Sequence, residues 1–262
     1  MVIHVLHLGL VPYGTALELQ RTLLELRKAG RIQNTLLLLE HPTVITLGRN
    51  AKLENVLASP EFLAQRGVEL FEIDRGGDVT FHGPGQLVAY PIFDLRTFEP
   101  KIGPVEFVRR LEEVLIRTCG DFGIGTQRIK GLTGVWTYAM PSKPEAKIAA
   151  IGVHISRGVT THGFALNVST DLDFFTLIVP CGITGKPVTS IERELQKSVT
   201  LDEVATVASR NFGRVFRSQM LWLESLEDFI GYVAPLAPAN QDIPARPPKE
   251  LRELRGDGSE LA

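Results

Sequence analysis

The chain has 262 residues, enough for one large domain or two small ones, and its hydrophobic content of 44% predicts a globular protein with a substantial core. Its net charge of −2 gives no electrostatic case for a nucleic-acid binder, and no apolar run is long enough to span a bilayer. Two cysteines without a Cys-x-x-Cys pair exclude a disulfide framework and disfavour a zinc site. The N-terminus lacks the features of a secretory signal, so we expect a cytoplasmic protein.

The first part of the chain predicts strands that alternate with short helices. Thr15 and Glu18 have the spacing of a capping box, which predicts a helix ending near Lys28. Ser59 followed by Pro60 predicts the start of a second, shorter helix. The strands expected here are 3–8, 35–40, 43–47, 68–73 and 87–93.

The second part predicts longer elements. Gly103 and Pro104 open an amphipathic helix, and Thr200 with Glu203 forms another capping box for a helix to about Ser218. Strands with little alternation, which should be buried on both faces, are expected at 132–137, 147–155 and 160–168. The fold class predicted is therefore α/β or α+β, a mixed β-sheet with helices packed on it.

The composition changes near residue 234. Prolines stand at 235, 238, 244, 247 and 248, and a charged end follows. Such a segment buries little apolar surface, so we expect residues 1–233 to fold as the main domain and residues 234–262 to be a flexible tail.

A glycine-rich run, RGGDVTFHGPGQ, occupies residues 75–86. Its glycines could bring backbone N–H groups close to a ligand, or they could simply form a tight turn between two strands. Arg75, His82 and Gln86 favour the ligand site, because three polar side chains cluster beside this backbone. Neither GxxxxGK[ST] nor GxGxxG is present, so the run does not predict a nucleotide site.

Cys181 lies in the turn Pro180-Cys181-Gly182, which can project a thiol into a cleft and aim a backbone N–H at a developing oxyanion. The alternative is a small buried hydrophobe, which fits Cys119 at the end of a helix. Lys147 is either an exposed lysine at a strand end or a cation beside the thiol, where it would lower the thiol's pKa.

The histidines fall into two groups. His4, His7 and His41 suit structural roles, whereas His82, His154 and His162 lie in the segments that carry chemistry. Among these, a dyad of cysteine with His82 is the main rival to cysteine with lysine. No tight ligand spacing such as HExxH occurs, so no metal is predicted.

Three segments, in this order, resemble the lipoyl(octanoyl) transferases, the octanoyltransferases of lipoate biosynthesis. They are RGGDVTFHGPGQLVAY at 75–90, KIAAIGVHISRGVTTHGFALN at 147–167 and PCGI at 180–183. EHPTVITLGRN at 40–50 resembles the family's early strand and turn, and the likeness covers about residues 3–217.

This resemblance implies a fold similar to the biotin and lipoate protein ligases, with no cofactor. It implies transfer of an octanoyl group from acyl carrier protein to a lysine of the lipoyl domains of 2-oxoacid dehydrogenase E2 subunits or of the glycine-cleavage H protein. Cys181 matches the nucleophile that carries a thioester, and Lys147 matches the lysine that lowers its pKa. The matches to the family's acyl-binding pocket are Arg75, Gly76, Gly77, Asp78, Val79, Thr80, Phe81 and His82, then Ala150, Ile151 and Gly152, then Gly163, Phe164 and Ala165.

Two departures from the family stand near the site. Residues 138–146, YAMPSKPEA, form a polar insert before Lys147, and Phe164 is bulkier than the expected leucine, so it could narrow the acyl pocket. A basic patch for an acidic carrier protein could come from Arg21, Arg27, Lys28, Arg49, Lys52, Arg109 and Arg110.

Two other functions compete with the transferase. An ATP-dependent lipoate–protein ligase has a similar fold, but Gly83-Pro84-Gly85-Gln86 replaces the ligase's acidic continuation and a well-placed cysteine is present. A non-catalytic protein that binds acyl carriers or lipoyl domains would need neither Lys147 nor Cys181.

Overall fold

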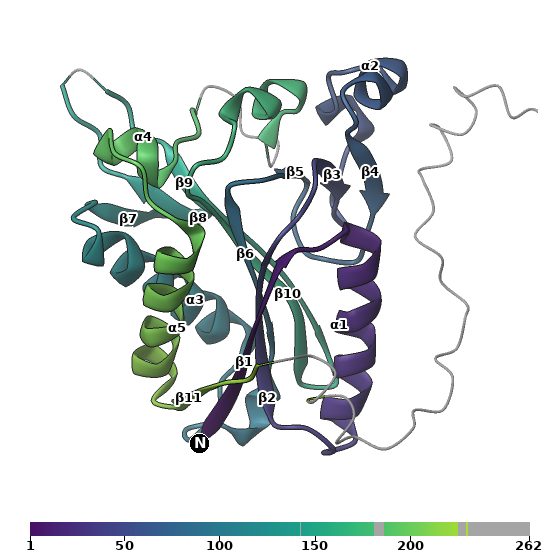
Figure 1. The fold of residues 1–262 in the computed structure, drawn as a ribbon, viewed down its shortest axis with the longest axis vertical. Coiled ribbons are helices and arrows are strands. Elements are labelled where there is room, and N and C mark those ends of the chain that lie inside the picture. The colour runs from purple at the N-terminus through teal and green to yellow at the C-terminus, as the bar shows by residue number, and fades with distance from the viewer. Residues whose placement is uncertain (142, 181–185, 225–228, 230–262) are drawn as a thin grey trace, which may run out of the picture.

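The computed structural model describes residues 1–141, 143–180, 186–224 and 229, and two β-sheets organise this part of the chain (Figure 1). The strands of the larger sheet lie side by side in the order β11 (Gln219–Trp222), β1 (Val2–Leu10), β2 (Asn34–Glu40), β6 (Gln86–Ile92), β10 (Val159–Asn167), β9 (Lys147–Ser156), β8 (Leu132–Thr137) and β7 (Thr126–Ile129). β1 is parallel to β11 and β2, whereas the remaining neighbours are antiparallel. The sheet is therefore mixed, as the sequence predicted.

The smaller sheet lies beside the upper end of the larger one in Figure 1. It consists of β4 (Glu69–Glu72), β3 (Val44–Leu47) and β5 (Val79–His82), with β3 in the middle. The chain passes from β5 directly into β6 of the larger sheet through the turn at 83–85. This short connection joins the two sheets at the glycine-rich run.

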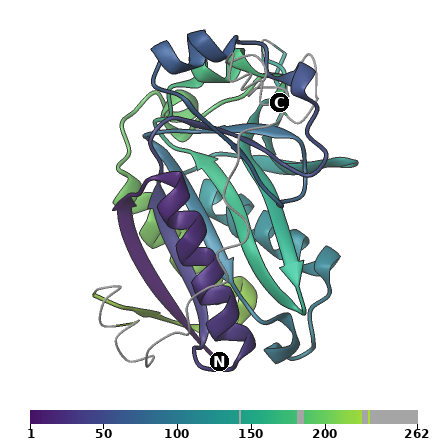
Figure 2. The same ribbon diagram turned by 90° about the vertical axis from the view of Figure 1, so that its right-hand side faces the viewer.

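Helices cover both faces of the larger sheet (Figures 1 and 2). α1 (Tyr13–Lys28) lies on one face, and α3 (Pro104–Asp121) and α5 (Leu201–Phe216) pack together on the other. Short helices complete the described residues: α2 (Pro60–Gln65), α4 (Ile191–Leu195) and the 3₁₀ turns η1 (Leu53–Asn55), η2 (Leu95–Thr97) and η3 (Leu172–Leu177). In the described part of the chain, no helix is both long and apolar enough to cross a membrane.

The two helical layers explain the uninterrupted leucines of β2. Leu36 and Leu38 join the core beneath α3 and α5, whereas Leu37 and Leu39 join the core beneath α1. Successive strand residues point to opposite faces, so a strand covered on both sides can be apolar at consecutive positions.

Most predicted elements are confirmed, but one helix start was wrong. Thr200 accepts a hydrogen bond from the Glu203 N–H and the Glu203 side chain returns one to the Thr200 backbone, so this capping box is present. Thr15 lies inside α1, which begins at Tyr13 after Pro12 without a side-chain cap. The sequence analysis missed β5, β7 and β11, and the predicted tail at 234–262 lies outside the described residues.

Candidate active site

Two adjoining cavities lie where α1, the smaller sheet and the centre of the larger sheet meet. The inner cavity is lined by Tyr13, Arg75, Gly77, Thr80, His82, Val88, Tyr90, Ala150, Ile151, Gly152, His162, Gly163, Phe164 and Ala165. The lysine cavity is lined by Thr80, Gln86, Lys147, Ala149, Ala150, Ala165, Asn167, Phe175, Pro180 and Val188. Because Thr80, Ala150 and Ala165 line both, the three segments singled out in the sequence converge on one continuous region.

Strand alternation sorts the predicted residues of β5. Thr80 and His82 face the cavities, whereas Val79 and Phe81 belong to the apolar cluster of the smaller sheet. The Phe81 ring stacks on Phe174 with ring centroids 4.9 Å apart. Val79 and Phe81 therefore support the site from behind and do not line it.

Gly76 and Asp78, which the resemblance also matches to the acyl-binding pocket, form hydrogen bonds that anchor the glycine-rich run. The Gly76 N–H donates to the Val153 carbonyl at 3.0 Å. The Asp78 carboxylate accepts from the Lys52 N–H at 3.2 Å and from Asn55 Nδ2 at 2.5 Å. Neither residue lines the inner cavity, but both hold the run against its neighbours.

Two glycines of the cavity floor allow backbones to approach closely. A Cβ on Gly163 would lie 2.0 Å from the Ala89 carbonyl oxygen, and one on Gly152 would lie 2.8 Å from the Gly76 oxygen. Both distances are far below van der Waals contact, so any side chain here would push the strands apart. Arg75 is buried next to this contact, and its Nη2 donates to the Thr46 carbonyl at 2.8 Å.

Lys147 is buried, with 6% of its surface exposed, so it is not the solvated strand-end lysine of the alternative interpretation. Its N–H donates to the Pro187 carbonyl and its own carbonyl accepts from the Thr189 N–H, both at 2.9 Å. Pro180, which immediately precedes Cys181, lines the same cavity. Cys181 itself lies outside the described residues, but the segments on both sides of residues 181–185 reach the lysine cavity.

Cys119 provides the contrast that the sequence predicted. It is fully buried in the core beneath α3 and α5. Burial raises the pKa of its thiol to about 12, so it remains a neutral thiol near pH 7.

A chain of side-chain hydrogen bonds determines the tautomer of His82. Asn167 Nδ2 donates to the Thr189 carbonyl at 2.9 Å, so Asn167 Oδ1 accepts from Gln86 Nε2, also at 2.9 Å. Gln86 Oε1 is then the acceptor facing His82 Nδ1 at 2.7 Å. His82 therefore carries its proton on Nδ1, and its Nε2 is an acceptor.

His41 and Tyr90 form a second buried pair beside this chain. The Val11 carbonyl lies 2.7 Å from His41 Nδ1, which must donate, so the Tyr90 hydroxyl donates to His41 Nε2 at 2.7 Å. Burial lowers the pKa of His41 to about 4 and that of His82 to about 3. Both rings are neutral at pH 7.

His162 is held in an unusual backbone conformation, with φ of +55° in the middle of β10. Its N–H donates to Gln20 Oε1 at 2.7 Å and its Nε2 donates to Asp74 Oδ1 at 2.9 Å. The hydrogen bond from His162 is the main reason that the pKa of Asp74 is lowered to about 2. His154 Nε2 lies 3.6 Å from the same carboxylate.

Phe164 is among the residues that line the inner cavity, but its ring packs into the core. Its ring stacks on Phe212 of α5, with centroids 5.8 Å apart, on the face of the sheet opposite the cavity. The neighbouring Ala165 faces the α1 side and lines both cavities. The additional volume at position 164 is therefore accommodated in the core beneath α5.

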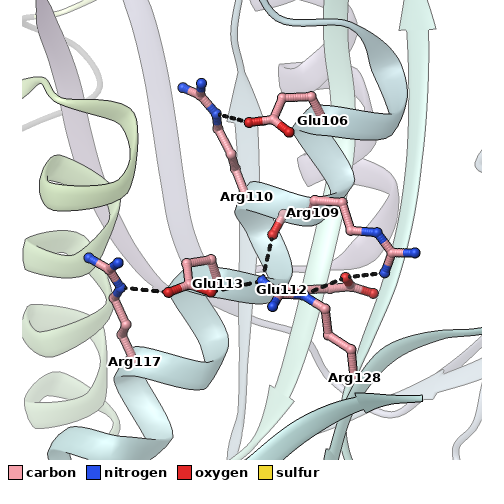
Figure 3. A network of polar contacts seen from close by, with 7 residues as sticks. All are labelled: Glu106, Arg109, Arg110, Glu112, Glu113, Arg117 and Arg128. Carbon is pink, nitrogen blue, oxygen red and sulfur yellow. Dashed lines mark hydrogen bonds and ion pairs between the residues drawn. The ribbon is translucent and has the colours of Figure 1, made fainter. Parts of the chain in front are cut away.

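A separate cavity of about 1050 Å³ opens over α3 and the end of α5. Several arginines line it, but most pair with glutamates of α3, as Figure 3 shows: Arg110 with Glu106, Arg109 with Glu112, Arg117 with Glu113, and Arg128 with both Glu112 and Glu113. The basic patch predicted from the sequence is therefore wrong as a single surface. Arg109 and Arg110 belong to this network, whereas Arg27 is buried on α1 and bonds Asn34.

Comparison with known proteins identifies the class. The chain belongs to the family of the lipoyl protein ligase A/B catalytic domain, whose model matches residues 12–213. Solved structures share the fold: a bipartite lipoate protein ligase from Thermoplasma acidophilum (18% identity, TM-score 0.67, 88% of this chain and 90% of that one) and a lipoate–protein ligase A bound with ATP (17%, 0.67, 89% and 93%).

The sequence relatives narrow the family further. The octanoyltransferase of Koribacter versatilis is 66% identical over 99% of each chain, and that of Acidobacterium capsulatum is 60% identical over 90% of this chain and 99% of its own. Within the family, the chain thus belongs to the octanoyltransferases, acyltransferases that move an octanoyl group from acyl carrier protein to lipoyl domains. This confirms the resemblance found in the sequence.

Tyr13, Val88 and Tyr90 also line the inner cavity, and the sequence analysis did not select them. Tyr90 lies four residues after Gln86 on β6. Its place on the strand that leaves the glycine-rich run could have identified it as a residue of the site. Tyr13 begins α1, far from the glycine-rich run in the sequence, so only the tertiary structure reveals that it lines the cavity.

The buried histidines predict how stability depends on pH. Unfolded histidine titrates near pH 6.5, well above the lowered pKa values of His41 and His82, so below that pH the unfolded state binds more protons. The free energy of unfolding should be highest above pH 6.5 and fall between pH 6.5 and 4.5, by up to about 1.4 kcal/mol per pH unit for each histidine.

Urea unfolding at several pH values measures this slope, and His82→Gln should reduce it. Asp74 interferes only below about pH 4, since its stabilising effect is lost as the pH falls through its lowered pKa. An unfolding free energy that stays constant from pH 7 to 4.5 would contradict the neutral, buried state of these rings.

Proposed function

We propose that the octanoyl transfer of this chain proceeds through a thioester on Cys181, assisted by Lys147. The observation that supports this most is the place of Lys147, buried in a cavity that Pro180 also lines and that adjoins the inner cavity. Thr189 and Pro187 connect the segment after Cys181 to the Lys147 backbone. A cation beside a thiol favours the thiolate, which is the nucleophilic form.

In the first step, the Cys181 thiolate attacks the carbonyl carbon of the donor thioester. The carbon–sulfur bond to the carrier breaks, and the carrier leaves as a thiol after taking up one proton. In the second step, the acceptor lysine amine attacks the enzyme thioester, an amide forms, the amine loses a proton and Cys181 returns as thiolate. Energy stored in the thioester is sufficient for the amide, so the reaction uses no ATP and no cofactor.

Lys147 is a better partner for Cys181 than His82. The His82 pKa of about 3 makes it a poor base near neutral pH, and its Nδ1 is already committed to Gln86. We therefore assign to Lys147 consecutive roles: its ammonium stabilises the thiolate and then gives a proton to the departing carrier thiolate. The resulting neutral amine takes the proton of the acceptor lysine, directly or through a water, and becomes an ammonium again.

The inner cavity is the proposed acyl site. Apolar atoms of Val88, Ala150, Ile151 and Ala165 border it, and glycines bring backbone close to the chain. The proposed donor is octanoyl-acyl carrier protein, and the proposed acceptors are lipoyl domains of 2-oxoacid dehydrogenase E2 subunits and the glycine-cleavage H protein, in the cytoplasm. The high identity to octanoyltransferases disfavours the ligase, whose likeness here is one of fold alone.

A transfer assay tests the proposal. Octanoyl-acyl carrier protein and a lipoyl domain, mixed with the protein in the absence of ATP, should yield octanoylated lipoyl domain, detected by mass. Cys181→Ala should reduce the rate to background, and Lys147→Met should reduce kcat by about 10²-fold or more, the usual size of a general-base contribution. Transfer that requires ATP and free octanoate would instead identify a ligase.

Cavity shape yields a second test, with two neighbouring residues as a matched pair. Ala165→Leu extends a side chain into both cavities and should raise KM for the octanoyl donor while a shorter acyl donor is less affected. Leu166→Met alters the opposite face of the same strand, where the residue lies in the core and lines neither cavity, and should leave the chain-length preference unchanged. Equal effects of the two variants on chain length would refute the assignment of the inner cavity.

A further inference from the structure

The Lys147 side chain is held against an aromatic ring. Its Nζ lies 5.0 Å from the centroid of the Trp136 indole, within the range of a cation–π interaction. Trp136 is buried on β8, directly opposite Lys147 on β9, and its Nε1 donates to the Leu132 carbonyl at 3.3 Å. This hydrogen bond therefore fixes the indole, and the Lys147 ammonium contacts the face of the ring.

A β-bulge aims Lys147 at this ring. Val135 pairs with Ala149 and Trp136 pairs with Lys147, so Ile148 is an extra residue on β9. Bulges of this kind bend a strand and redirect the side chain beside them. Here the redirected side chain is that of Lys147.

Gly134 leaves the space that the lysine stem occupies. Its φ is +121°, and a Cβ at this position would lie 3.3 Å from Lys147 Cε and 2.6 Å from the Ala149 carbonyl oxygen. Both the conformation and the space therefore require glycine.

The far side of the bulge is anchored from α3. Buried Glu112 accepts from the Gly134 N–H at 3.4 Å, and its other oxygen accepts from Arg109 at 2.7 Å and Arg128 at 3.0 Å, the network drawn in Figure 3. The ion-pair network on α3 thus contacts β8, the strand that carries Trp136, although its arginines line neither the inner cavity nor the lysine cavity.

Lys186 approaches the same ring from the segment after Cys181. Its Nζ lies 5.6 Å from the Trp136 centroid, and it forms an ion pair with Glu145 of the polar insert. The Glu145 carboxylate compensates this second cation, so both ammonium groups can share one indole.

We propose that Trp136 is a positioning residue that fixes the Lys147 ammonium in the lysine cavity, which Pro180 also lines, on a bulge shaped by Gly134 and Glu112. This inference rests on the proposed function, since it assumes that Lys147 acts on Cys181. Trp136 lines neither described cavity, so its effect on the reaction passes through Lys147.

The test is the pH dependence of Cys181 alkylation by iodoacetamide, measured by peptide mass so that Cys119 does not contribute, together with kcat and KM. Trp136→Leu should move the midpoint of alkylation toward that of an ordinary thiol, near pH 8.5. For each pH unit by which the midpoint rises, the thiolate fraction at pH 6.5 should fall about tenfold. Trp136→Phe keeps an aromatic face and should fall between the two, and kcat should fall while KM for the donor stays within about twofold.

Trp222→Leu is the matched control, because it removes the chain's other tryptophan from the edge strand β11 and should change nothing. Trp136→Phe carries the test if Trp136→Leu does not fold. A wild-type midpoint and kcat in folded Trp136 variants, with the midpoint raised in Lys147→Met, would overturn this inference alone. An unchanged midpoint in Lys147→Met itself would overturn the role of Lys147 in the proposed function.

Discussion

The site depends on the close antiparallel pairing of β9 with β10 at the centre of the larger sheet. Gly163 and Gly152 face each other across this pair. Because Gly163 has no side chain, β6 can lie close to β10, and because Gly152 has none, the Arg75–Gly76 backbone can lie close to β9. Through these contacts the glycine-rich run is placed over β9, where its Thr80 and His82 meet Ala150 and Ala165. A side chain at either glycine would separate the layers that form both cavities.

The fold alone does not decide which reaction a chain of this architecture performs. The ligases of similar fold are related to this chain at 17–18% identity, which retains the sheet and helices but says nothing about reaction type. In this chain Lys147 begins β9, and Pro180, which precedes Cys181 in the sequence, lines the lysine cavity. The proposed pair of Lys147 and Cys181 suits thioester exchange, which needs no nucleotide.

Elements with strong periodicity could be predicted from the sequence, and short ones could not. The leucines of β2, the buried run of β10 and the capping box of α5 signalled their structures because burial and local hydrogen bonds alone determine them. β5 has only four residues inside a glycine-rich run, and β7 and β11 are short strands at the ends of the sheet, so each depends on pairing with distant partners. Thr15 has the spacing of a cap, but Pro12 already starts that helix.

The residues of the site also divide into those that the sequence could predict and those that it could not. Resemblance placed Arg75, Ala150 and Gly163 in one region, and the cavity contains all three. It could not separate Thr80 from Val79, because that distinction needs the orientation of β5. Trp136 gave no signal, since its relation to Lys147 arises from the pairing of β8 with β9 and from a bulge that no local pattern predicts.

The covalent intermediate is the central claim, and an intact-mass measurement tests it most directly. The protein is mixed with octanoyl-acyl carrier protein in the absence of acceptor and ATP. A single octanoyl adduct should form on the wild-type protein, hydroxylamine should remove it, and it should not form with Cys181→Ala. A wild-type protein that transfers octanoate to a lipoyl domain under the same conditions without ever forming an adduct, or an adduct that persists in Cys181→Ala, would contradict it.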